Sequence, residues 1–321
     1  MTELTATLRK KWDLENEPDE ARAALTAIIL ENQDKHFSRL VDDGGAALGE
    51  STFRQDLYEA LKSHLRTHPL PELCSMQPMT GPIGTVAFYR QRVGEVEEAI
   101  SVDEEGNETN VQIPVIMLDI ATDTITADTR MMKALRDSRS INAGVEELLT
   151  EISREILGIL LNSATSSNRF FEAMDSANLK EELTRASHMV HRQSQRAAAN
   201  KIVGNKDMLK KLGVEVPKSN GQVQRVGALD GKWTIYLDPL FPKGQLMAWY
   251  QGPSILDTGI IYSPYILAAM TPTFVNPPEG MCVDGALRIR HKITLVRPEI
   301  CYLVRMPEAD PIPAFRAGQA R

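Results

Sequence analysis

The glycine-rich segments of the chain are the first places where phosphate chemistry could occur. Residues 227–232 read Gly-Ala-Leu-Asp-Gly-Lys, which approaches a phosphate-binding loop. The segment is one residue short of that motif, and Trp233 stands where a serine or threonine would hold magnesium. Residues 81–84 lack the third glycine of a dinucleotide-binding turn, and their proline removes a backbone donor. We therefore predict no nucleotide site at either segment.

The histidines form two pairs at helical spacing, the spacing that metal ligands on one helix require. His64 and His68 are four residues apart, as in a zinc-binding HExxH helix, but Leu65 replaces the glutamate and no third ligand is evident. His188 and His191 share one face of a basic helix, which is a poor setting for a cation. We expect surface histidines there and predict no metal site.

Nucleophilic chemistry also lacks a recognisable motif. No GxSxG elbow occurs, and the three cysteines Cys74, Cys282 and Cys301 are odd in number and widely spaced. We expect buried, reduced thiols, with intersubunit disulfides as the alternative. The sequence therefore predicts neither an enzyme nor a protein with a cofactor.

Length and composition fit a soluble protein of about two domains. The chain has 321 residues, of which 42% are hydrophobic and 25% charged, with a net charge of −7. An acidic balance argues against a protein that coats nucleic acid through a broad basic face. No apolar run approaches the roughly 18 residues of a membrane helix, and the amino terminus lacks the apolar core of a signal peptide. We expect a cytosolic, non-membrane protein.

Alternating helical and strand patterns indicate the α+β class. Apolar residues recur at helical spacing over four segments, which we expect to be helices: 19–41, 52–66, 142–163 and 178–200. Further strands and a short helix are expected at 201–203, 206–212, 233–237, 246–250, 286–296 and 300–306. Pro69 and Pro71 are expected to end the second helix.

A long hairpin with an acidic tip is the most unusual predicted feature. The strand-like runs 85–93 and 111–120 flank a segment, residues 94–110, that has seven acids and no base. The acids are Glu95, Glu97, Glu98, Asp103, Glu104, Glu105 and Glu108. Because an isolated two-stranded hairpin is marginally stable in water, two interpretations remain open. The segment is either a solvated loop of a monomer or an arm that lies on basic groups of a neighbouring subunit.

Several segments, in this order, resemble the major capsid proteins of T-even-like, contractile-tailed bacteriophages. Residues 11–12 and 27–37 resemble the amino-terminal region of that family. Residues 74–84, Cys-Ser-Met-Gln-Pro-Met-Thr-Gly-Pro-Ile-Gly, match its most distinctive motif. Residues 252–253 and 257–265 resemble a later Gly- and Pro-Tyr-containing segment, and residues 295–299 resemble the closing strand of HK97-type shell proteins. The motif residues are Gln77, Pro78, Met79, Gly81, Pro82 and Gly84.

The resemblance implies the HK97-type capsid fold, in which a long spine helix, an extended loop and an amino-terminal arm join a peripheral and an axial domain. On this sequence the implied parts are a helical propeptide-like segment at 1–50, the arm at 51–83, the extended loop at 84–125, the peripheral domain at 126–170 and 269–321, and the axial domain at 171–268. The implied function is a major capsid protein that self-associates as hexamers and pentamers into the icosahedral head shell.

The resemblance also implies partners and two kinds of site. The partners are further copies of the chain, a scaffold, a maturation protease, a portal and decoration proteins, with packaged DNA held only weakly on the inner face. The family's protease cuts after a glutamate preceded two positions earlier by Leu or Ile, which fits Glu50 followed by Ser51. The same tripeptide pattern recurs at residues 29–31, 70–72 and 149–151, and the glycine-rich loop position favours Glu50.

Charge suggests where a neighbour's acidic hairpin tip would lie. Arg288, Arg290, His291 and Lys292 form a basic cluster near the carboxyl terminus and are candidate partners for that tip. Two other functions remain as alternatives: an encapsulin-like compartment that encloses a cargo enzyme, and a soluble α+β enzyme.

Overall fold

The computed structural model describes residues 3–42, 51–102, 108–135, 141–218, 221–270, 274–275 and 283–309. Seven α-helices occur in these ranges: α1 (Glu3–Lys11), α2 (Glu20–Asp42), α3 (Ser51–Thr67), α4 (Leu70–Leu73), α5 (Ile141–Ser166), α6 (Leu179–Ser194) and α7 (Lys206–Lys211). The four long predicted helices correspond to α2, α3, α5 and α6, so the α+β prediction is confirmed.

Local sequence explains where the long helices begin and end. Asp19 caps α2, because its Oδ1 accepts a hydrogen bond from the Arg22 N–H at 3.0 Å. Helix α6 stops six residues before the predicted end at 200, because Gln195 adopts the left-handed conformation with φ of 50°. The Gln195 N–H donates to His191 O and so closes the last turn. Beyond Pro69 the chain forms the additional short helix α4, which the sequence had not predicted.

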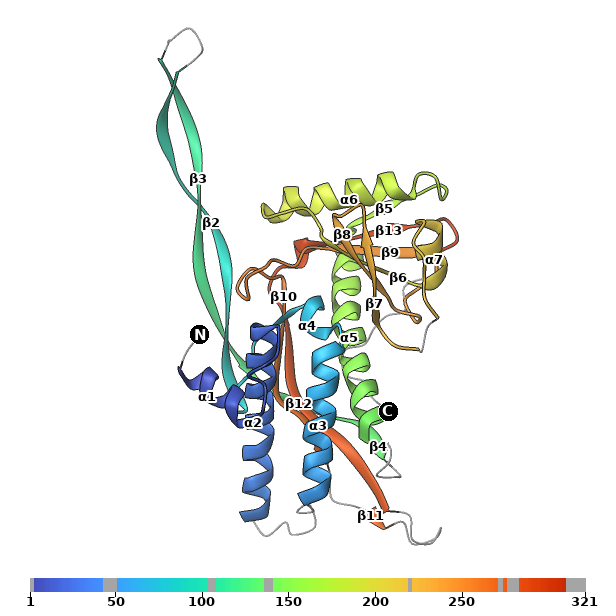
Figure 1. Cartoon of the computed structure of the whole chain (residues 1–321). Coiled ribbons are helices and arrows are strands. Elements are labelled where there is room, and N and C mark those ends of the chain that lie inside the picture. The colour runs from blue at the N-terminus through green and yellow to red at the C-terminus, as the bar shows by residue number, and fades with distance from the viewer. Residues whose placement is uncertain are drawn as a thin grey trace.

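Helix α5 is the spine of the molecule. Its 26 residues run from the region of one sheet to the region of the other, beside α3 (Figure 1). Leu148, Leu149, Ile152 and Ile156 lie on its buried stripe, each at most 2% exposed. At roughly 25 cal/mol per Å² of apolar surface buried, this stripe is a major source of folding free energy.

The first sheet has five strands around a long central pair. Strands β1 (Ser75–Met76), β10 (Ile260–Met270), β12 (Val283–Leu295) and β11 (Phe274–Val275) follow in that order, and β4 (Asp128–Leu135) also pairs with β12. Strand β10 is antiparallel to β12, with irregular register between Pro264 and Ile266. That irregularity accommodates a proline within a strand that has neighbours on both sides.

The second sheet has six strands in the order β5-β13-β9-β6-β8-β7. The strands are β5 (Phe170–Glu172), β6 (Lys201–Gly204), β7 (Gln224–Leu229), β8 (Trp233–Leu237), β9 (Gln245–Trp249) and β13 (Cys301–Arg305), the last preceded by a 3-10 helix at Pro298–Ile300. A separate apolar cluster joins this sheet to α6 and α7 through residues such as Leu183, Leu209 and Ile235.

The strands of each sheet come from separate stretches of the chain. Strand β10 lies mainly within the range 171–268 but pairs in the five-stranded sheet. Strand β13 lies within 269–321 but pairs with β5 and β9 in the six-stranded sheet. If the six-stranded sheet were one insertion into the five-stranded sheet, the chain would leave the five-stranded sheet and return to it once. The chain instead passes back into the six-stranded sheet a second time, at β13. Among the helices that the structure describes, none is long and apolar enough to cross a membrane.

Candidate functional site: the extended hairpin and its root

A two-stranded ribbon projects from the body and forms the most distinctive surface of the molecule (Figure 1). It consists of β2 (Ile83–Val102) and β3 (Glu108–Thr126), paired antiparallel from Ile83 opposite Thr126 to Val102 opposite Glu108. One register shift lies between Val93 and Val96, where β2 has one more residue than β3. The predicted hairpin is confirmed, and both of its strands are longer than the predicted runs.

The inward face of the ribbon is anchored to the body at its root. Val86 and Phe88 of β2 and Ile125 of β3 are at most 7% exposed. They pack in one apolar cluster with Met79, Ala127 and the β10 residues Ile261, Tyr265 and Ile266. The first sheet thus supports the root, while the outer ribbon stands clear of the other elements in Figure 1.

Gln77, from the family-like motif, binds the backbone of the root directly. Its side-chain Nε2 donates to Ala87 O at 2.7 Å and to Ile255 O at 3.2 Å, and its Oε1 accepts from the Ala87 N–H at 2.9 Å. The Gln77 N–H donates to Tyr262 O of β10 at 2.9 Å. A single side-chain amide therefore substitutes for a neighbouring strand at Ala87, because it satisfies both backbone groups of that residue.

The remaining motif residues shape the turn into the hairpin. The Met79 N–H donates to Pro264 O at 2.9 Å, and the Ala127 N–H donates to Pro82 O at 2.8 Å. Gly84 packs closely on Met79, because a Cβ at residue 84 would lie 3.0 Å from the Met79 Cγ and would require that side chain to shift. Pro78 is half-buried beside them, and Gly81 lies in the turn. The motif thus acts through packing and hydrogen bonds at the root.

A charged and aromatic cluster on the other side of the root was not predicted from the sequence. The Tyr89 N–H donates to Leu256 O at 2.9 Å, and the Arg297 guanidinium donates to Tyr89 O. The Arg196 guanidinium lies 5.5 Å from the Tyr89 ring centroid. Arg297 belongs to the segment 295–299 that resembles shell proteins, which is the signal that could have indicated it.

The acidic residues lie toward the distal end of the ribbon. Asp103, Glu104 and Glu105 fall outside the described residues. Glu97 pairs with Ile113, Glu98 with Gln112 and Glu108 with Val102 in the strand register, so their backbones lie on the outer ribbon. They are therefore remote from the root and its support.

The four basic candidates lie together along β12 but differ in accessibility. Arg290 is half-buried with its guanidinium 5.3 Å from the Tyr265 ring centroid, and Lys292 pairs with Asp128 at 3.0 Å. His291 is 2% exposed and packs edge-on against Tyr262, so its imidazole lies inside the monomer. Arg288 pairs with Ala269 and Met131 in the strand register. Of the candidates whose side chains the structure describes, Arg290 and Lys292 are partly exposed and His291 is buried.

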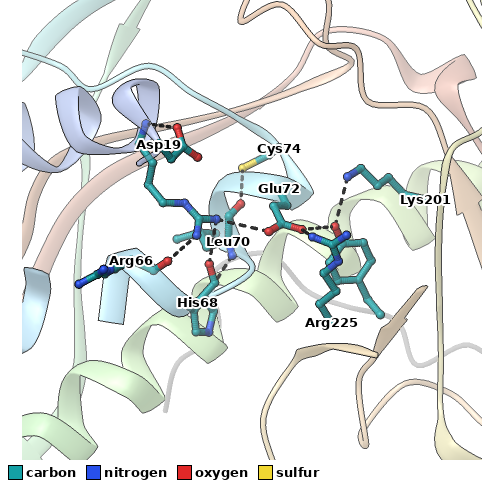
Figure 2. Close-up of polar contacts among 10 residues, drawn as sticks. Asp19, Arg66, His68, Leu70, Glu72, Cys74, Lys201 and Arg225 are labelled. Atoms are coloured by element: carbon teal, nitrogen blue, oxygen red, sulfur yellow. Dashed lines mark hydrogen bonds and ion pairs between the residues drawn. The ribbon is translucent and has the colours of Figure 1, made fainter. Parts of the chain in front are cut away.

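The amino-terminal helices are tied to the body at Glu72 of α4, as Figure 2 shows. The Glu72 carboxylate pairs with Arg22 of α2 and with Arg225 of β7, each at 3.5 Å. It also accepts a hydrogen bond from the Tyr236 hydroxyl at 2.8 Å, and Lys201 Nζ donates to that hydroxyl at 3.2 Å. One carboxylate thus joins α2, α4 and the six-stranded sheet. Of the predicted cleavage pair, Glu50 lies outside the described residues and Ser51 is the first residue of α3.

His68, Cys74 and Cys301 are buried in the packed interior. Burial lowers the pKa of His68 to about 4, with smaller effects from His64 and Arg22, and its Nδ1 accepts a hydrogen bond from the Leu70 N–H at 3.2 Å. Cys74 and Cys301 are buried and unpaired in disulfides, whereas Cys282 lies outside the described residues. No group of three potential metal ligands occurs in the part of the chain that the structure describes.

The described residues thus form a long spine helix, two sheets and a projecting ribbon whose root packs against the body. Comparison with known proteins identifies the particular family. The model of the family described as "Major capsid protein Gp23" matches residues 93–282, which is more than half of the chain. The chain therefore belongs to the Gp23 family of phage major capsid proteins, and its α+β architecture is the one expected from the HK97-type resemblance.

Individual relatives are more distant. Over 67 residues the chain is 31% identical to the major capsid proteins of Enterobacteria phages T4 and T6. This stretch covers 21% of this chain, 12% of the T4 protein and 13% of the T6 protein. The match thus spans only a small part of these curated relatives.

Solved structures from phages are similar at a low level. A protein of Mycobacterium phage Bobi aligns with a TM-score of 0.46 and 12% identity, over 75% of this chain and 90% of that one. The capsid of Myoviridae phage XM1 aligns with a TM-score of 0.42 and 14% identity, over 74% and 90% of the two chains.

Proposed function

We propose that copies of this chain associate as hexamers and pentamers into the icosahedral shell of a phage head, in a structural rather than a catalytic role. The observation that carries the proposal is the ribbon of β2 and β3, which packs against the body at its root and extends away from its own subunit (Figure 1). A ribbon of two strands has little core of its own, so a surface on a neighbour would stabilise its outer part.

The proposal assigns one domain role to each sheet. In this proposal the six-stranded sheet with α6 and α7 is the axial domain at the centre of each hexamer or pentamer. The five-stranded sheet with α5 is the peripheral domain. The chain assembles in the host cytoplasm with a scaffold, encloses DNA that binds the inner face only weakly, and joins a portal and decoration proteins. The net charge of −7 disfavours tight binding of the genome.

The acidic hairpin tip is proposed to meet a basic surface of the adjacent subunit. Arg290 and Lys292, with Arg288 beside them on β12, are the candidates whose strand positions support this contact. Reversing Glu104 and Glu105 to Lys should reduce the yield of closed shells at least severalfold, because like charges would then oppose one another. The monomer should keep its far-ultraviolet circular dichroism. Shells formed at the wild-type yield would contradict the contact.

Maturation by a phage protease is proposed at the bond between Glu50 and Ser51. The site precedes α3 directly, and the glycine-rich segment before it separates two helices. Mass spectrometry of protein from mature particles should find an amino terminus at Ser51. An amino terminus at Met1 or Thr2 would refute the cleavage.

Electron microscopy of the purified chain tests the main proposal. Negative-stain images of the chain, alone and coexpressed with a scaffold, should show rings, tubes or closed shells, and the solution mass should exceed that of a monomer. Dependence on the scaffold distinguishes a phage head from an encapsulin-like compartment that assembles alone. A small, monodisperse particle in both conditions would refute the shell function.

A further inference from the structure

The amino-terminal helical pair, defined as residues 3–42 with α1 and α2, is built into the main core. Ala27, Leu30 and Phe37 of α2 are at most 1% exposed. They belong to the same apolar cluster as Leu61 of α3 and Leu267 of β10. The pair therefore covers an extensive apolar face of the rest of the subunit.

Two adjacent amides of α2 bind backbone groups of the body. Asn32, 6% exposed, donates from Nδ2 to Met79 O at 2.7 Å. Gln33 is fully buried, donates from Nε2 to Ala268 O and accepts from the Ala268 N–H at 3.2 Å. Met79 belongs to the hairpin root, and Ala268 lies on the strand that supports it. Losing α2 would leave these buried backbone groups unpaired, which is costly.

A third set of contacts lies at the other end of the pair. The Arg22 guanidinium donates to Arg66 O at 2.5 Å and to His68 O at 3.5 Å, in addition to its ion pair with Glu72. Apolar, amide and charged contacts thus hold the pair to three separate parts of the body. Each of these contacts joins residues that lie outside the connecting segment 43–50.

We propose that the helical pair, once cut from the rest of the chain, stays bound to its own subunit as a non-covalent clamp on the hairpin root. The binding surface consists of α3, His68 and Glu72 beyond it, Leu267 and Ala268 of β10, and Met79, and its ligand is residues 3–42. The clamp holds the root against its support, because Asn32 binds Met79 of the root and Gln33 binds Ala268 of the supporting strand β10.

A controlled cut in the full chain tests the proposal. A recognition sequence for a specific protease is inserted within residues 43–50, and the folded chain is purified and then cut. In size-exclusion chromatography at about 1 μM protein, the two fragments should co-elute with the mass of the uncut monomer. At this concentration only complexes with a dissociation constant below about 1 μM stay intact. They should separate only in denaturant. A free amino-terminal fragment under native conditions, with the larger fragment either folded or precipitated alone, would overturn the proposal.

Variants of α2 test the origin of the binding. Asn32→Ala combined with Gln33→Ala should raise the dissociation constant of the cut pair by about tenfold or more, because three hydrogen bonds to backbone groups are lost. Ser38→Ala combined with Arg39→Ala is the matched control, because both side chains are exposed on the same helix. Equal effects of the two double variants would overturn the role of the amides. If the amide double variant does not fold before cutting, Asn32→Ala alone replaces it.

The role of this clamp in a mature shell rests on the proposed cleavage after Glu50, whereas its binding does not. An uncleaved chain in mature particles would refute the cleavage and leave co-elution of the engineered fragments as evidence for binding. Separation of the engineered fragments would refute only the clamp.

Discussion

Replacing Gln77 by leucine should loosen the hairpin root without unfolding the molecule. Leucine keeps much of the side-chain volume but removes the hydrogen bonds to Ala87 and Ile255. Each such bond contributes about 0.5–1.5 kcal/mol net, and water replaces part of the loss at a half-buried site. We therefore expect the root to be destabilised by about 2 kcal/mol, which corresponds to a roughly 30-fold change in the opening equilibrium.

Amide hydrogen exchange measures this opening. Exchange of the amides at residues 85–90 should accelerate by roughly 30-fold in the Gln77→Leu variant, while the amides of α6 keep their rates. Gln193→Leu is the control, because Gln193 is exposed on α6 and the chemical change is the same. Root amides that exchange within about threefold of wild type in a folded variant would refute the reasoning.

Gln77→Glu separates hydrogen bonding from packing. The carboxylate still accepts from the Ala87 N–H but faces the Ala87 and Ile255 carbonyl oxygens without a donor. This repulsion raises the folded-state pKa of the new carboxyl above its ordinary value of about 4.3. At a pH below about 4.3, the protonated carboxyl should restore the protection of the root amides against exchange to the wild-type level. This protection should be lost as the pH rises through the folded-state pKa. Protection that does not vary with pH would contradict this account.

Three further predictions concern the core. Phe37→Ala should lower the free energy of unfolding by about 3–5 kcal/mol in urea titrations, because the ring is 1% exposed, and a change below 1 kcal/mol would contradict its core role. Because the folded-state pKa of His68 is about 4 and the ordinary value 6.5, stability should fall as the pH falls through that window, by up to about 3 kcal/mol. His68→Asn should remove that decrease, and an unchanged pH profile would refute it. In a Cys282→Ser background, a thiol reagent at pH 8 should label neither Cys74 nor Cys301 before unfolding, since burial raises the pKa of both, and rapid native labelling would disprove their burial.

The four long helices and the hairpin could be predicted because their signals are local. Leu57, Leu61 and Leu65 recur at spacing four and are all at most 1% exposed in α3. Strand β10 had no such signal. Residues 260–268 of it are almost fully buried on both faces, so the segment reads as a continuous apolar run that periodicity cannot assign, and Pro264 argues against a central strand.

The root of the hairpin could be predicted only in part, because its contacts join distant residues. The motif around Gln77 was identified by resemblance, but its bonds to Ala87 and Ile255 depend on how two segments pack. Arg297 and Tyr89 are 208 residues apart in the chain. The local sequence pattern around either residue does not predict this contact. Charge does not predict it either, because Arg297 binds a backbone carbonyl and not an acidic side chain.

The side-chain amides that satisfy both backbone groups of one residue also limit how copies of the chain can meet. Besides Gln77 at Ala87 and Gln33 at Ala268, Asn200 donates to Gln251 O at 2.7 Å and accepts from the Gln251 N–H at 3.0 Å. An open strand edge is a template for pairing with the next molecule, and a terminal amide ends the ladder because it offers no further backbone to extend it. At Ala87, Ala268 and Gln251 the amide occupies both backbone groups of the residue and leaves neither for an added strand. In the proposed shell, copies would then meet at these places through side chains, whose contacts can be made, broken and corrected, and not through fibre-like strand pairing.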